Sequence, residues 1–157
     1  MKFIDLFTVE HTSKYFGNIT FSSDYYIDEV NVKYNDNDIS IVMWDDIIFD
    51  ENYLKISFGV IDKYLDIIQM VKDAVKNRSQ NSIEIRGFND HNDIQNIQAM
   101  VNNIYPHLAF GIDAYDNFYL SINYSVSWEH PSHIFTVEMD QKLNIIGMKY
   151  VSKGEII

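Results

Sequence analysis

The C-terminal third of the chain alternates apolar and polar residues, and this period constrains the fold more than any other feature of the sequence. From Phe118 to Val126 every second side chain is apolar, and the residues between them are Tyr, Ser or Asn. A period of two places the apolar side chains on one face of a β-strand. Three further stretches fit strands of the same kind: residues 108–114, 135–139 and 143–150. Because short connections join all four, the sequence predicts an antiparallel meander.

A second pair of strands is predicted nearer the N-terminus. Residues 25–34 and 39–44 are rich in β-branched and aromatic side chains, and the four residues between them are Asn, Asp, Asn and Asp. Asn and Asp favour turns because they bond to the local backbone and tolerate left-handed conformations. A four-residue loop would place Tyr34 opposite Ile39, with the alternate apolar side chains on one face. We expect that face to join the core.

The middle of the chain has the period of helices. Over residues 51–76 apolar side chains recur every three or four positions, and charged ones lie largely off that stripe. Asp50 is placed to cap this helix, because its carboxylate can accept from the first free backbone N–H groups. Gly59 destabilises the first half of this helix by up to about 1 kcal/mol relative to Ala, so the helix could instead begin near Phe58. A shorter helix is predicted over residues 93–104, ending before Pro106.

Length and composition fit one folded domain. The chain has 157 residues, of which 46% are hydrophobic and 15% aromatic, far more than disordered acidic segments carry. It has 2 Pro, 6 Gly and no Ser- or Gly-rich linker, so we expect residues 1–157 to form a single domain. The predicted class is α+β: an antiparallel sheet made of the N-terminal hairpin and the C-terminal four-strand meander, with two helices packed on one face.

Acidic residues dominate the charge of the chain. There are 23 Asp and Glu against 12 Lys and Arg, a net charge of -11. This excess repels phosphate backbones and anionic lipid headgroups, so we expect no nucleic-acid or membrane partner and favour a basic protein partner. No stretch approaches the ~18 apolar residues of a membrane span, and the N-terminus lacks the apolar core of a secretory signal. The predicted location is the cytoplasm.

Most of the acidic excess lies in one segment. Residues 24–51 hold nine acids and one base, Lys33, whereas residues 52–83 carry a net charge of +2. The predicted hairpin and its two ends are therefore either a solvated edge or a docking surface, on which acids accelerate association with a basic protein and Trp44 anchors it. The candidate partner-binding residues are Asp36, Asp38, Trp44, Asp45, Asp46, Asp50 and Glu51.

No motif of an enzyme class is present. The chain has no Gly-rich phosphate loop, no Gly-x-Ser-x-Gly, no His-Glu-x-x-His and no cysteine. A small hydrolase or ligand-binding site using residues 128–133, which hold a Trp, a Glu, two His and a Ser, is the alternative function. His130 and His133 with Pro131 between them fit neither a helical metal pair nor one strand face. We therefore predict a strand connection there, with no metal, no cofactor and no catalytic residue.

Two further acidic pairs have a structural interpretation. Asp45 and Asp46 are expected to be neighbours on a strand, where adjacent side chains point to opposite faces and cannot form a catalytic carboxylate dyad. Residues 90–93 read Asp-His-Asn-Asp but lack the Gly and Glu of a calcium loop. We expect Asp90 or Asn92 to cap the following helix, with His91 as another residue that the alternative function could use.

Four short segments carry a resemblance to a known kind of family. They are Tyr15–Ile19 (YFGNI), Ala109–Ile112 (AFGI), Asn123–Ser125 (NYS) and Phe135–Asp140 (FTVEMD). Together they resemble small acidic bacterial proteins of a domain family of unknown function, of the kind grouped with immunity proteins of polymorphic toxin systems. The resemblance implies a binding protein that neutralises a toxin domain by direct contact, and the acidic charge of the chain favours a basic one. A purely structural domain that dimerises through the meander edge is a third possibility.

Overall fold

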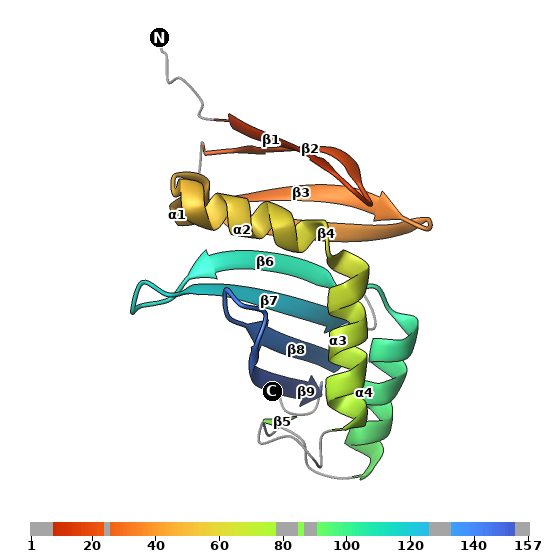
Figure 1. The fold of residues 1–157 in the computed structure, drawn as a ribbon. Helices are drawn as coiled ribbons and strands as arrows, with labels where there is room; N and C mark the ends of the chain where they lie inside the picture. Colours follow the sequence, from red (N-terminus) through yellow and green to blue (C-terminus); the bar gives the residue numbers. More distant parts are fainter. Residues whose placement is uncertain (1–7, 24–25, 78–84, 87–90, 126–132, 153–157) are drawn as a thin grey trace.

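The computed structural model describes residues 8–23, 26–77, 85–86, 91–125 and 133–152, which form an α+β fold with a large, mostly antiparallel sheet (Figure 1). The large sheet has seven strands in the order β3-β4-β6-β7-β8-β9-β5. In chain order these are β3 (Ile27–Tyr34), β4 (Asn37–Trp44), β5 (Ile85–Arg86), β6 (His107–Ile112), β7 (Phe118–Ser125), β8 (His133–Met139) and β9 (Ile145–Ser152). The predicted fold class is confirmed.

The predicted meander is confirmed, and the predicted hairpin is present with a different register. Strands β6 to β9 pair antiparallel in sequence order. The β3–β4 turn has two residues, Asn35 and Asp36, with φ of 49° and 63°, so Tyr34 pairs with Asn37 and not with Ile39. Two central residues with positive φ are typical of a type I′ turn, whose twist suits the flanking strands. Because the register differs by two residues, each side chain keeps its predicted face.

One parallel pair joins the hairpin to the meander. β4 pairs with β6 from Ile41 opposite Leu108 to Met43 opposite Phe110. Parallel neighbours need a long crossover connection. Here the crossover contains α1 (Asp45–Ile48), α2 (Glu51–Ile61), α3 (Tyr64–Lys76), β5 and α4 (His91–Asn103). The outer strand of the meander is also partly covered, because β5 pairs with β9 at two positions.

The first predicted helix is divided in two. Asp50 caps α2 as predicted, because its side chain accepts a hydrogen bond from the Tyr53 N–H at 3.0 Å. The apolar stripe continues past Ile61, but the helix ends there and α3 starts at Tyr64, so the prediction of one helix over residues 51–76 is wrong. Gly59 lies inside α2 and does not delay its start. The second predicted helix corresponds to α4.

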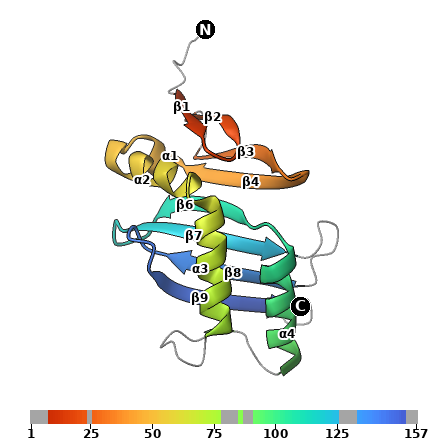
Figure 2. The ribbon, with the colours of Figure 1, turned by 45° about the vertical axis from the view of Figure 1, so that its right-hand side comes forward.

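The helices cover one face of the sheet, as predicted. α3 and α4 lie side by side on this inner face (Figure 2). The sheet residues buried beneath the helices alternate along the strands: Leu108, Phe110, Leu120, Ile122, Tyr124, Phe135 and Val137. The helices contribute buried apolar residues to the same core: Ile67, Val71, Ile97 and Val101. Within the described ranges no helix is both long enough and apolar enough to span a membrane.

A short hairpin that the sequence does not predict precedes the large sheet. β1 (Thr8–Ser13) and β2 (Gly17–Ser22) pair antiparallel as a separate two-stranded sheet. Gly17 has φ of +75°, a conformation that glycine adopts without steric cost. Ile19 and Phe21 of β2 are buried, so this hairpin extends the core.

Candidate functional site

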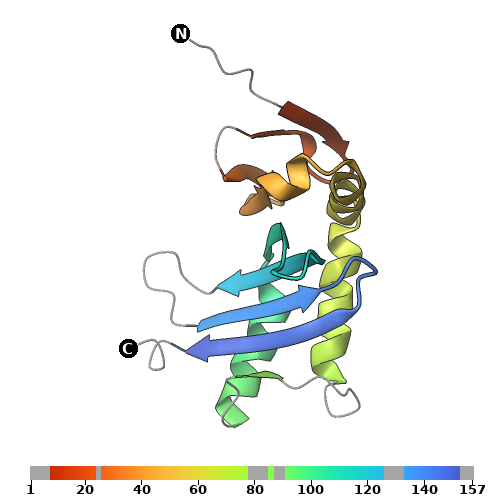
Figure 3. The same ribbon diagram turned by 90° about the vertical axis from the view of Figure 1, so that its left-hand side faces the viewer.

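One end of the large sheet gathers acidic residues from distant parts of the sequence. The start of β3, the end of β4, α1, the start of α2 and the β6–β7 and β8–β9 turns meet there, at the left of Figure 1 and facing the viewer in Figure 3. We call this surface the acidic end. We define it by seven acids of the described residues: Asp45, Asp46, Asp50, Glu51, Asp113, Asp116 and Asp140.

The structure separates the predicted partner-binding residues into two groups. Five of the seven lie at the acidic end: Trp44, Asp45, Asp46, Asp50 and Glu51. Asp36 and Asp38 lie at the other end of the same hairpin, about 20 Å away at ~3.3 Å per strand residue. Asp38 also lies 3.8 Å from the Lys33 Nζ, in an exposed ion pair. The predicted surface is therefore not continuous, and its larger part is at the acidic end.

The prediction that Asp45 and Asp46 are strand neighbours is wrong. Both lie in the first turn of α1, where negative charge complements the positive end of the helix dipole. The Asp45 N–H donates to the Tyr26 carbonyl at 2.9 Å, which ties α1 to the start of β3. A helix of only four residues is too short to show a helical period in the sequence.

Exposed hydrophobic side chains gather at the same end. Of the seven large hydrophobic residues that are exposed in the described ranges, six lie at the acidic end: Tyr26, Ile27, Trp44, Phe49, Tyr115 and Ile146. Tyr26 and Tyr115 are 85% and 84% exposed, and Trp44 is 39% exposed. The seventh, Met70, lies on α3. Aromatic residues set among charged ones are characteristic of protein interfaces, so this coincidence marks the acidic end as the candidate site.

Two turns of the meander share one construction. The first residue of each, Asp113 or Asp140, accepts hydrogen bonds at 2.8–3.0 Å from the backbone N–H groups two and four positions later. The residue three positions later has positive φ: 62° at Asp116 and 64° at Leu143. Both turns read Asp-x-x-x-Asn, a sequence signal that could have revealed them. The construction holds both carboxylates in fixed positions at the acidic end.

The hydrogen bonds of the β8–β9 turn also change the pKa of Asp140. Partial desolvation acts to raise the pKa of Asp140, but hydrogen bonds from the backbone of Asn144 and Lys142 outweigh it and hold this pKa below its usual value. The carboxylate is therefore fully ionised at neutral pH.

A pocket of about 470 Å³ opens at the acidic end between α2 and the two turns. The residues that line it include Asp113, Asp140, Lys142, Tyr53 and the buried Phe118. The Tyr53 hydroxyl donates to the backbone carbonyl of the β6–β7 turn at 3.1 Å, which holds α2 against that turn. Another pocket of about 390 Å³ lies between α3 and β9, but a single charged residue lines it.

The outer face of the sheet carries a histidine with a structural role. The His107 Nδ1 accepts a hydrogen bond from the Ser40 N–H at 2.8 Å, next to the parallel β4–β6 pair. Burial lowers the pKa of His107, although the negative charge of Glu29 acts in the opposite direction. An unprotonated Nδ1 is required for this bond, so His107 helps to join the two parts of the sheet as a neutral ring.

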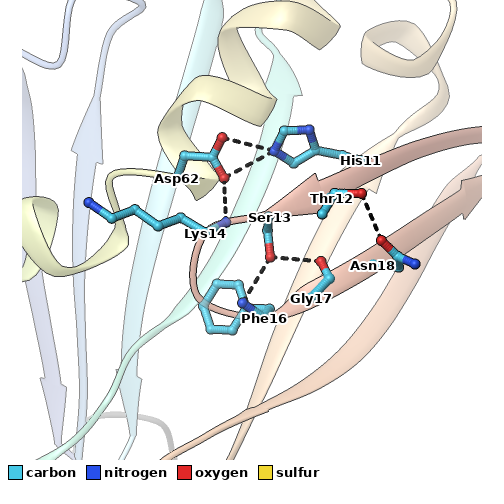
Figure 4. Close-up of polar contacts among 8 residues, drawn as sticks. All are labelled: His11, Thr12, Ser13, Lys14, Phe16, Gly17, Asn18 and Asp62. Carbon is cyan, nitrogen blue, oxygen red and sulfur yellow. Dashed lines mark hydrogen bonds and ion pairs between the residues drawn. The ribbon is translucent and has the colours of Figure 1, made fainter.

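A second histidine, which the sequence does not single out, fixes the N-terminal hairpin to the helices (Figure 4). The His11 Nε2 lies 3.0 Å from both carboxylate oxygens of Asp62, and the ring stacks on Phe58 at 4.5 Å. Asp62 also accepts from the Lys14 N–H at 2.9 Å. The Ser13 hydroxyl is engaged within its own turn, donating to a carbonyl and accepting from an N–H. Because these contacts join β1 to the end of α2, the cluster is an anchor for β1.

Several predicted residues cannot be placed at the site. Residues 128–132 lie outside the described ranges, and His133 is the first residue of β8. Asp90 also lies outside them, and Asn92 is inside α4, so Asn92 is not its cap. Across the described ranges, no group of three or more His, Cys, Asp or Glu residues is arranged to hold a metal ion.

When the chain is compared with known proteins, no family model matches it, and neither does any curated protein or solved structure. The resemblance to an uncharacterised bacterial family therefore stays a prediction.

Proposed function

We propose that this chain is a cytoplasmic binding protein that docks a basic protein partner on its acidic end. The observation that carries the proposal is the coincidence there of these seven acids with six of the seven large hydrophobic residues that are exposed in the described part of the chain. Aromatic anchors such as Trp44 supply the energy of an interface core, and the surrounding acids steer a basic partner and exclude acidic ones.

Two acids of this end, Asp46 and Glu51, are exposed. In the part of the chain that the structure describes, the ion pairs His11–Asp62 and Lys33–Asp38 lie elsewhere, and neither involves Asp46 or Glu51. Exposed Asp46 and Glu51 therefore contribute to a negative potential that extends about 8–10 Å into physiological salt. Such a field accelerates association with a positively charged surface.

The partner that best fits this surface is a toxin domain that acts on nucleic acid. Such a domain needs a basic face to neutralise phosphates. A bound acidic protein would cover that face and block the substrate. In this proposal the chain is an immunity protein, which agrees with the resemblance of its sequence and requires no catalytic residue.

The test is complex formation with the product of the neighbouring gene, measured by co-purification and by calorimetric titration. The combined variant Trp44→Ala, Asp46→Asn, Glu51→Gln should weaken binding by about 30-fold or more, because losing one interface anchor costs about 2 kcal/mol. None of these three side chains is buried, so the fold should be retained.

The matched control is Asp36→Asn with Asp38→Asn, which removes the same charge from the far end of the same hairpin. We expect its affinity to stay within about twofold of the unmodified chain, since ~20 Å exceeds the screening length. Equal losses in both variants, or no loss in either, would contradict the proposal.

A further inference from the structure

We propose that the pocket between α2 and the β6–β7 and β8–β9 turns receives an arginine side chain of the partner. This inference rests on the proposed function and names the chemical group recognised at the acidic end. The pocket, at about 470 Å³, falls within the ~300–1,000 Å³ of small-ligand pockets, so it can hold a guanidinium group and much of its stem.

Two carboxylates give the pocket its affinity for a cation. Both backbone hydrogen bonds to Asp113 end on Oδ1, and each carboxylate can accept about four such bonds. Oδ2 of Asp113 is therefore available to a ligand. Asp140 is held by its turn in the same way, with Oδ2 accepting a long bond of 3.3 Å from an amide side chain. Because the turns orient both groups in advance, little entropy is lost when they bind a cation.

The half-buried Tyr53 ring favours arginine over lysine, and Phe118, which is buried in the core, packs beside it. The Tyr53 and Phe118 rings lie 5.6 Å apart between centroids, with 38° between their planes. A guanidinium is planar and weakly hydrated, so it can stack on such a ring while its N–H groups bond to a carboxylate. A lysine ammonium is compact and strongly hydrated, and it gains less from an aromatic wall. Ile146, at the rim, is exposed and can cover the aliphatic stem.

A substitution of Lys142 can test whether Asp113 and Asp140 bind an arginine or only stabilise their turns. Lys142 lines the same pocket, and its positive charge lowers the pKa of Asp140. A bound arginine would be repelled by Lys142. Removing the lysine charge should therefore strengthen arginine binding, whereas a site that matters only for the fold would gain no affinity from the change.

The experiment titrates the full chain with the tripeptide acetyl-Gly-Arg-Gly-amide and follows backbone amide shifts by NMR. The comparison peptide carries citrulline, which has the shape of arginine without its charge. We expect millimolar binding of the arginine peptide, with shifts concentrated at residues 113–118 and 140–146, and binding at least about tenfold weaker for the citrulline peptide.

Three variants localise the binding. Asp113→Asn with Asp140→Asn keeps an oxygen acceptor for the turn N–H groups but removes both charges, and should weaken arginine binding at least about tenfold. Lys142→Gln should strengthen it about two- to threefold. Asp36→Asn removes a charge at the far end of the β3–β4 hairpin, outside the pocket lining, and keeps a residue type that accepts positive φ, so binding should change less than about twofold.

The inference is overturned if the shifts lie elsewhere, if citrulline binds as well as arginine, or if the double Asn variant binds unchanged. Any of these results leaves the proposed function intact as long as the Trp44, Asp46 and Glu51 variant loses affinity for the protein partner. Conversely, arginine binding in the pocket would not rescue the proposed function if that variant bound the partner normally.

Discussion

Two fully buried tyrosines provide a sharp test of the packing between helices and sheet. Tyr64 of α3 and Tyr124 of β7 both lie in the core, and burial raises the pKa of each hydroxyl, so both stay neutral. The Tyr64 hydroxyl donates to the Pro106 carbonyl at 2.6 Å. The Tyr124 hydroxyl has no hydrogen-bond partner among the described residues. Replacing each tyrosine by phenylalanine should therefore have opposite effects.

The magnitudes follow from the cost of burying an unsatisfied polar group. Tyr64→Phe removes a short buried bond and leaves a carbonyl without its donor, which should lower the free energy of unfolding by about 1–3 kcal/mol. Tyr124→Phe removes a buried hydroxyl that makes no bond and keeps the ring, so it should be neutral or stabilising by up to about 1–2 kcal/mol. For a chain of this length, 2 kcal/mol corresponds to about 4–8 °C in Tm.

The assay is urea unfolding of the two variants followed by far-UV circular dichroism, with thermal melts as a second measurement. The difference between the variants should be at least about 1 kcal/mol, with Tyr124→Phe the more stable. If Tyr124→Phe were destabilised by as much as Tyr64→Phe, the reasoning would be refuted, because the Tyr124 hydroxyl would then have to make a hydrogen bond of similar strength.

Three further predictions concern the turn, the β4–β6 junction and the N-terminal anchor. Asp36→Gly should stabilise the chain by up to about 1 kcal/mol, because Asn-Gly is the preferred pair in a type I′ turn. The control, Asp38→Gly within β4, should destabilise it. Urea unfolding measures both variants, and a destabilised Asp36→Gly would contradict the turn assignment. The pKa of His107 is lower in the folded chain than its ordinary 6.5, so the folded state binds fewer protons there than the unfolded state. The contribution of His107 to stability is therefore complete above pH 6.5 and is lost as the pH falls below that value. The free energy of unfolding of His107→Gln, measured between pH 5 and 8, should depend less on pH than that of the unmodified chain. An unchanged pH dependence would contradict this. Asp62→Asn should cost only about 0.5–1 kcal/mol because the pair is partly exposed, and hydrogen exchange should accelerate in β1 and β2 but not in β7.

Much of the fold can be predicted from the sequence, because half-buried strands and capped helices have characteristic patterns in their own residues. The alternation from Phe118 to Val126 predicts β7, and the carboxylate of Asp50 predicts the start of α2. The β1–β2 hairpin is not predicted from the sequence, because its buried apolar residues, Ile19 and Phe21, alternate over too short a span to give a recognisable period. The parallel pairing of β4 with β6 is not predicted either, because alternation shows on which face of a strand each side chain lies but not which strand lies next to it.

The candidate site could be predicted only in part. Counting charge along the chain finds the acids that follow Trp44, since they are close in sequence. It does not find Asp113, Asp116 and Asp140, which come from turns more than 60 residues later and reach the same end only because β6 lies beside β4. The exposure of Tyr26 and Tyr115 depends on which end of the sheet is left uncovered, and no local pattern records that.

The most direct test of the docking surface is a hydrogen-exchange footprint of the chain with and without its protein partner. We expect slower exchange in the complex at residues 44–53, 113–117 and 140–146, which come together only in the fold. The turn at residues 34–38, at the far end of the same hairpin, should exchange at the same rate in both states. Protection centred on that turn or on the helical face, with the acidic end unchanged, would contradict the account.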